Sequence, residues 1–244
     1  LLGASVVGAS TGLVIASAFT VVVSILLLRS RTFLGAVQAP TRKQTRDYYD
    51  FSLPVMFTNI GSFLYNRVDI LMVGIFLSSS AVGIYNVAVA VSGILAMSLT
   101  AFNQLFPPLA SKLYNKDRME ELRNVYKTVT RWVFTISLFP SIALILYADS
   151  VLFVFGEGFT RGSMVLTLFT IAQLTFCVVG PSGYLLMMTD HHYLAMINQL
   201  LSGAINVILN YVLILRFGLI GAAMATATVL AAINVARVFQ VLYF

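Results

Sequence analysis

The chain has 244 residues, of which 59% are apolar and 10% are charged. A soluble globular domain is about 45–50% apolar and about 25% charged. The composition therefore excludes an ordinary soluble domain, a disordered chain and a small disulfide-stabilised secreted module. The formal net charge of +6 does not indicate binding to nucleic acid, because basic residues in so apolar a chain mark the cytoplasmic loops of a membrane protein.

Seven apolar stretches are each about as long as the 20 residues that a membrane-spanning helix needs. They are residues 1–28, 51–77, 84–108, 129–148, 163–187, 193–215 and 219–242. Transmembrane strands are shorter and alternate between apolar and polar residues, and these stretches do not alternate. The sequence therefore predicts an all-α, polytopic membrane protein with seven transmembrane helices.

The first and last apolar stretches resemble each other, since residues 7–10 (VGAS) compare with residues 220–223 (IGAA). The two stretches are six helices apart, which fits a protein made of two parallel six-helix halves. We therefore expect residues 1–28 to be the last helix of a missing N-terminal bundle and residues 29–50 to be a basic cytoplasmic linker. Residues 51–244 are then a complete six-helix C-terminal bundle, and the chain is a fragment of a longer protein.

Basic residues concentrate in two of the segments between the apolar stretches. Residues 29–50 and 109–131 hold most of the 15 lysine and arginine residues. The positive-inside rule predicts that these segments and the C-terminus are cytoplasmic in a multi-pass cell-membrane protein, and that residues 149–162 are external. Within the second basic segment, residues 115–127 are expected to form a short surface helix capped by Asp117.

Polar side chains recur inside the apolar stretches, where they are costly and tend to line a cavity or to bond to another helix. In the second and sixth stretches they follow steps of three and four residues, which places them along one face of a helix. The expected cavity residues are Arg67, Asp69, Asn59, Asn66, Asn103, Gln104, Gln173, Asn198, Gln199, Asn206, Asn210 and Asn234. A single amide is explained by an interhelical hydrogen bond, but two polar stripes on different helices favour a shared cavity. Arg237 is interpreted as an interfacial side chain whose charge reaches the cytoplasmic headgroups.

Motifs of catalysis and metal binding do not occur in the sequence. There is no nucleophile elbow, phosphate-binding loop or zinc signature. His191 and His192 are adjacent and point in different directions, and no further ligand lies at metal spacing. We therefore expect no catalytic residue, no metal, no cofactor and no enzymatic activity.

Several strings of residues carry a resemblance to a known family. They are Ser52-Leu-Pro-Val-Met56, Tyr65-Asn-Arg-Val-Asp69, Val82-Gly-Ile-Tyr-Asn-Val-Ala88, Gln104-Leu-Phe-Pro-Pro-Leu-Ala110, Phe155-Gly-Glu-Gly-Phe159 and the stretch from Asn206 to Thr226. In these strings, residues 51–244 resemble the polysaccharide transporter family. Its members are lipid-linked oligosaccharide flippases of the multidrug/oligosaccharidyl-lipid/polysaccharide flippase superfamily.

The resemblance implies two six-helix bundles around a central cavity and transport by alternating access. The implied partners are the lipid bilayer, a polyprenyl diphosphate sugar and the missing N-terminal half, with no nucleic acid. Arg67 is then expected to contact the diphosphate, because a guanidinium binds phosphate oxygens in a bidentate way. Asp69 is expected to orient polar partners or to take up a proton or cation.

Three alternatives stay open at this point. A drug/cation antiporter of the same superfamily would favour acidic residues in the cavity. A non-transporting membrane scaffold in envelope assembly would tolerate removal of the cavity's polar groups. A membrane enzyme would need more chemical groups than the sequence offers.

Overall fold

The structure is a computed structural model that describes residues 2–30, 41–188 and 192–243. These residues form α-helices and one short 3-10 helix, and no strand occurs among them. The chain divides into two compact units, Leu1–Asp50 and Phe51–Phe244. The predicted all-α membrane fold is confirmed.

The first unit contains α1 (Leu2–Ser30) and the beginning of α2 (Arg42–Phe76). The hydroxyls of Thr20 and Ser24 in α1 donate to carbonyls one turn earlier, at 2.8 Å, which satisfies these polar groups inside an apolar helix. α2 begins within the predicted linker 29–50, because Thr41 and Gln44 form a capping box in which the Thr41 N–H donates to Gln44 Oε1 at 2.9 Å. Residues 31–40 of that linker lie outside the described residues.

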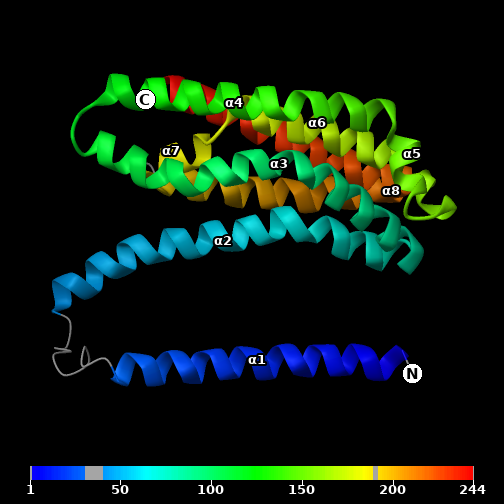
Figure 1. The fold of residues 1–244 in the computed structure, drawn as a ribbon, viewed down its shortest axis with the longest axis horizontal. Helices are drawn as coiled ribbons and strands as arrows, with labels where there is room; N and C mark the ends of the chain where they lie inside the picture. The colour runs from blue at the N-terminus through cyan, green and yellow to red at the C-terminus, as the bar shows by residue number, and fades with distance from the viewer. Residues whose placement is uncertain (1, 31–40, 189–191, 244) are drawn as a thin grey trace. The chain divides into compact units, whose positions relative to one another are not determined.

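The second unit is a bundle in which α3 (Ser79–Tyr114), α4 (Met119–Leu146), α6 (Ser163–Val179) and α8 (His192–Tyr243) lie side by side (Figure 1). The short α5 (Ala148–Phe153) and η2 (Glu157–Gly162) lie at one end of this bundle, and α7 (Ser182–Met188) lies at the other (Figure 1). Its main core joins side chains of α2, α3, α6 and α8, among them Val73, Tyr85, Leu166 and Ala222.

Among the described residues, four helical segments are long and apolar enough to cross a membrane. They are Ser79–Tyr114, Met119–Leu146, Glu157–Val179 and Tyr193–Gln240. The count of seven transmembrane helices stays a prediction.

α8 contains two of the predicted stretches, 193–215 and 219–242, and folds back on itself between them. Gly218 has φ 57° and ψ −130° inside the helix, a conformation that glycine adopts without steric cost. Asn198 hydrogen-bonds Gln240 and Asn206 hydrogen-bonds Thr226 across the fold. Residues 192–217 and 219–243 are therefore the two antiparallel arms of a helical hairpin, called below the first and second arms of α8.

Two details of the sequence prediction are wrong. The stretch 163–187 is not one helix, because Gly180 with φ 68° and Pro181, which lacks an N–H, separate α6 from α7. No separate surface helix occupies residues 115–127, because α4 begins at Met119 and continues to Leu146. Asp117 has φ 56° and lies in the turn after α3, so it does not cap α4.

Candidate functional site

The second unit encloses a cavity of about 560 Å³ that is lined by α2, α3, α6, α7 and both arms of α8. The structure places five of the predicted site residues on its wall, namely Asn59, Asp69, Asn103, Gln173 and Gln199. Further polar residues on the wall are Ser62, Thr100, Ser202, Thr226 and Arg237. The cavity wall therefore combines ten polar side chains with apolar ones such as Phe169, Phe176 and Leu230.

Asp69 is the centre of a buried hydrogen-bond network on the cavity wall. The Asp69 carboxylate, 3% exposed, accepts hydrogen bonds from the Tyr85 hydroxyl at 2.8 Å and the Thr226 hydroxyl at 3.3 Å. The N–H of Ile70 donates to its second oxygen at 2.8 Å. Because a buried carboxylate is stable only when donors surround it, this residue holds α2, α3 and the second arm of α8 together.

Asn206 and Asn210 extend this network into the α8 hairpin. Asn206 donates to the Thr226 hydroxyl at 3.3 Å, and Asn210 donates to Asn206 Oδ1 at 2.7 Å. Both amides are fully buried, and neither is among the residues that line the cavity. Asn210 Oδ1 has no hydrogen-bond partner within the described part of the chain.

A second chain of hydrogen bonds joins three residues of the cavity wall. Arg237 Nη2 donates to Gln199 Oε1 at 3.0 Å, and Gln199 Nε2 donates to Ser62 Oγ at 2.9 Å. The chain links the two arms of α8 to α2. It also orients the Gln199 amide, because each end of that amide has a defined partner.

Asn198, Asn234, Arg67 and Gln104 are not among the residues that line the cavity. Asn198 forms a reciprocal amide pair with Gln240, with distances of 2.6 and 3.0 Å. Asn234 is buried, and its side chain has no partner among the residues that the structure describes. Arg67 and Gln104 are exposed, and the side chain of Asn66 lies outside the described residues.

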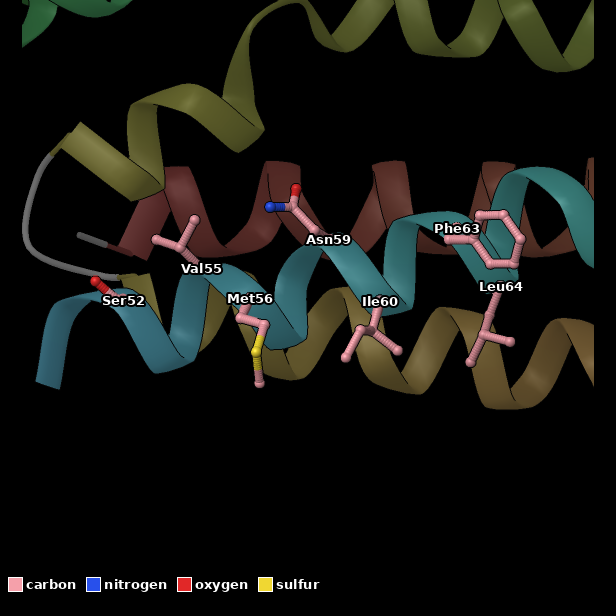
Figure 2. Close-up of a pocket in the computed structure, with 7 residues that line it drawn as sticks. All are labelled: Ser52, Val55, Met56, Asn59, Ile60, Phe63 and Leu64. Atoms are coloured by element: carbon pink, nitrogen blue, oxygen red, sulfur yellow. The ribbon is translucent and has the colours of Figure 1, made fainter. Parts of the chain in front are cut away.

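A shallow groove runs along α2 beside the cavity and is lined by Ser52, Val55, Met56, Asn59, Ile60, Phe63 and Leu64. Figure 2 shows Val55 and Asn59 on one side of α2 and Met56 and Ile60 on the other. Val55 and Asn59 line both the groove and the cavity. An apolar surface therefore adjoins the polar cavity at Asn59.

The wall carries groups that can hydrogen-bond a polar molecule. Among the described residues that line the cavity, Asp69 is the one acid and Arg237 the one base. No group of three or more histidine, cysteine, aspartate or glutamate side chains is placed to hold a metal ion in the described ranges. Amides and hydroxyls form the rest of the polar surface, and these groups both donate and accept hydrogen bonds.

Tyr85, Thr226 and Arg237 are among the network residues that sequence reasoning did not assign to the site. Tyr85 and Thr226 both lie within the strings that carry the family resemblance, so a signal for them was present. Arg237 was assigned to the interface because it lies near a predicted helix end. Its contact with the cavity depends on the fold of the α8 hairpin, which the sequence pattern does not specify.

The fold and the cavity together define an all-α, polytopic membrane protein built around a polar interior site. Residues 1–164 match the family described as polysaccharide biosynthesis protein, and the chain belongs to this family. The resemblance to polysaccharide transporters seen in the sequence is thereby confirmed.

Curated relatives are similar over much of this chain. The probable low-salt glycan biosynthesis flippase Agl15 of Haloferax volcanii is 29% identical, over 79% of this chain and 41% of that protein. The probable flippase AglR of the same organism is 25% identical, over 77% of this chain and 40% of that protein. The teichuronic acid biosynthesis protein TuaB of Bacillus subtilis is 23% identical, over 58% of this chain and 29% of that protein. The chain thus spans less than half the length of each.

Two solved structures share the fold. A MOP superfamily transporter from Pyrococcus furiosus superposes with a TM-score of 0.65 and a multidrug resistance MATE family transporter, in an outward-facing conformation, with a TM-score of 0.66. Each is 20% identical in sequence, and the match covers 78% of this chain and 43% of the other.

Proposed function

We propose that the full-length protein is a flippase that moves lipid-linked oligosaccharide across the cell membrane for the synthesis of a surface polysaccharide. The observation that carries this proposal is a cavity of about 560 Å³ whose wall includes ten polar side chains, inside an apolar helical bundle. Membership of the polysaccharide biosynthesis protein family and similarity to the probable flippases Agl15 and AglR support it. The protein acts as a transporter and not as an enzyme.

In this proposal the chain supplies one bundle of a two-bundle transporter, and the other bundle belongs to the rest of the protein. The cavity receives the hydroxyl-rich sugar, which its amides and hydroxyls bind by hydrogen bonds. The lipid tail stays in the bilayer, where it contacts apolar surface such as the groove along α2. Alternating access then requires the two bundles to rock about the bound headgroup. The basic segments 29–50 and 109–131 and the C-terminus face the cytoplasm.

The test fills the cavity without changing its charge. Ala96 of α3 lines the cavity, whereas its neighbour Met97 is 66% exposed. In the full-length protein, Ala96→Trp places an indole ring in the cavity and is expected to abolish flipping. Met97→Trp places the same ring on the outer surface and is the matched control. Flipping is measured in proteoliposomes as loss of lectin access to a short-chain lipid-linked oligosaccharide.

Three outcomes would contradict the proposal. Normal flipping by Ala96→Trp at wild-type abundance would show that the cavity is not part of the transport path. Complementation of polysaccharide synthesis by Ala96→Trp in cells would favour the scaffold alternative. Export of a cationic drug by a wild-type protein that moves no lipid-linked oligosaccharide would favour the antiporter alternative.

A further inference from the structure

The ten polar side chains on the cavity wall fall into two groups. Seven have a hydrogen-bond partner within the chain, and the two charged residues of the wall are in this group. The seven are Asp69, Arg237, Ser62, Thr100, Gln199, Ser202 and Thr226. The other three are amides that make no hydrogen bond among the described residues, namely Asn59, Asn103 and Gln173. The side chains that the wall leaves entirely unused are therefore uncharged.

The three unused amides lie on three different helices, α2, α3 and α6. Tyr184 of α7 adds a hydroxyl to the wall that likewise makes no hydrogen bond within the described ranges, and this side chain is 41% exposed. A carboxamide offers donors and an acceptor, and a hydroxyl is both at once. A bound molecule that displaces water from these groups must replace its hydrogen bonds, and a sugar carries the hydroxyls to do so.

Gln173 lies close to the hydrogen-bond network of Asp69. It follows Phe169 by one turn of α6, or about 6 Å, and the Phe169 ring packs edge-on against the Tyr85 ring with centroids 5.5 Å apart. The Tyr85 hydroxyl donates to the Asp69 carboxylate at 2.8 Å, and Gln173, Phe169 and Asp69 all line the cavity. A negative charge bound at Gln173 would therefore be repelled by the ionised carboxylate.

Arg237, the one base among the described residues that line the cavity, already has a partner in the protein. Its Nη2 donates to Gln199 Oε1 at 3.0 Å, and Gln199 donates in turn to Ser62. An anion that recruited Arg237 would compete with this chain of hydrogen bonds, which joins both arms of α8 to α2. The wall thus offers an anionic sugar no cation that is held ready for it.

We infer that this wall selects an uncharged sugar, and that Gln173 and Asn59 are specificity-determining residues whose neutral amides exclude hexuronic acids. The inference rests on the proposed function and deepens it, because it names the class of sugar that the lipid carries. A hexuronic acid differs from its hexose in having a carboxylate in place of the C6 hydroxymethyl group. Burial of that carboxylate without a charged partner is unfavourable, whereas the hydroxyl of the hexose pairs with an amide.

The experiment measures equilibrium binding by the full-length protein in phosphatidylcholine nanodiscs. The probes are short-chain polyprenyl diphosphates that carry glucose, galactose or mannose, each compared with the corresponding uronic acid. The diphosphate and the tail are the same within a pair, so their contributions cancel in the ratio of the two affinities. For the wild type we expect the hexose to bind at least about tenfold tighter, because the penalty for burying an unpaired charge exceeds the free energy of a tenfold change.

Gln173→Arg places an unpaired guanidinium on the wall, where it can bind a carboxylate in a bidentate way, and should abolish or invert the preference. Asn59→Arg should act in the same direction, and its exposed position on α2 keeps the test valid if Gln173→Arg does not fold. Asn86 of α3 is an exposed amide that does not line the cavity. Asn86→Arg adds the same charge outside the cavity, so it is the matched control and should keep the wild-type ratio.

Gln173→Leu tests whether this amide contacts the sugar at all. It should weaken hexose binding by about 2–10-fold, which corresponds to the loss of one hydrogen bond, whereas Asn86→Leu should not change it. Equal or tighter binding of the uronic acids by the wild type would overturn the inference. So would a ratio that both Gln173→Arg and Asn59→Arg leave unchanged, because the preference would then be set elsewhere in the protein.

These outcomes are separate from those that test the proposed function. A wild-type protein that prefers the hexoses but does not flip them would refute flipping and retain the selectivity of the wall. A protein that flips hexose and uronic acid ligands with equal affinity would refute this inference alone.

Discussion

The backbones of α2 and α8 come close together at Gly61, and its replacement by alanine should separate the two helices. A Cβ at Gly61 would lie 2.8 Å from the carbonyl carbon of Gln199 and 2.9 Å from its oxygen, whereas ordinary contacts begin at 3.4 Å. Both atoms belong to the backbone, so α2 must move by about 0.6 Å or more. Overpacking of this kind costs about 1–3 kcal/mol. The shift also weakens the hydrogen bond from Gln199 to Ser62, which lies one residue further along α2.

The assay compares apparent thermal stability and flipping for a graded set of variants of the full-length protein. Gly203→Ala should cost less than Gly61→Ala, because its Cβ would lie 3.2 Å from the Gly61 oxygen and 3.3 Å from Leu64 Cβ. Gly93→Ala in α3 is the control, since no atom lies within 4 Å of the added Cβ, and it should be neutral or stabilising. If Gly61→Ala were as stable and as active as Gly93→Ala, the close approach of α2 and α8 would be refuted.

Three further predictions concern the network, the topology and the break between α6 and α7. Tyr85→Phe removes the hydroxyl that donates to the Asp69 carboxylate at 2.8 Å and should lower the free energy of unfolding by about 1.5–3 kcal/mol. Thermal denaturation measures this loss. If Tyr85→Phe costs as much free energy of unfolding in the Asp69→Asn background as in the wild type, the prediction is contradicted, because the effects of two residues that interact are not additive. A cysteine at Ser150 should react with an impermeant thiol reagent from outside the cell and one at Asn115 should not; the reverse pattern would invert the predicted orientation. Gly180→Ala should reduce stability and abundance, since Gly180 has φ 68° and its Cβ would overlap a threonine hydroxyl of α4; unchanged thermal stability would contradict this geometry.

The sequence by itself determined the class of fold. Runs of about 20 apolar residues cannot remain in water and, once in lipid, must satisfy their backbone groups internally, which a helix does within one segment. Pattern reasoning also selected five residues on the cavity wall, because polar side chains inside apolar helices must face a partner or a cavity. The turn in α8 was visible as well, since Gly218 interrupts the apolar pattern between two stretches.

Local sequence did not determine where helices break or where a given polar residue faces. The Gly180-Pro181 pair looks like any other Gly-Pro pair in an apolar run, so the sequence did not show that a helix ends there. Asp117 was expected to cap a helix, but it lies in the turn that follows α3. Asn206 and Gln199 look equivalent in the sequence, yet the first lies buried within the hairpin and the second lines the cavity.

Only the tertiary structure decided which charges belong to the cavity. Arg67 lies on the stretch with the richest polar pattern but is exposed, so its contact with substrate stays a prediction, whereas Arg237 near a helix end lies on the wall of the cavity in the second unit. The reason is physical. Helical spacing fixes which residues share a face, but the direction of that face depends on how the helix packs against others. At α8 this packing follows from the reversal at Gly218, which places Arg237 beside Gln199, a residue 38 positions earlier in the chain.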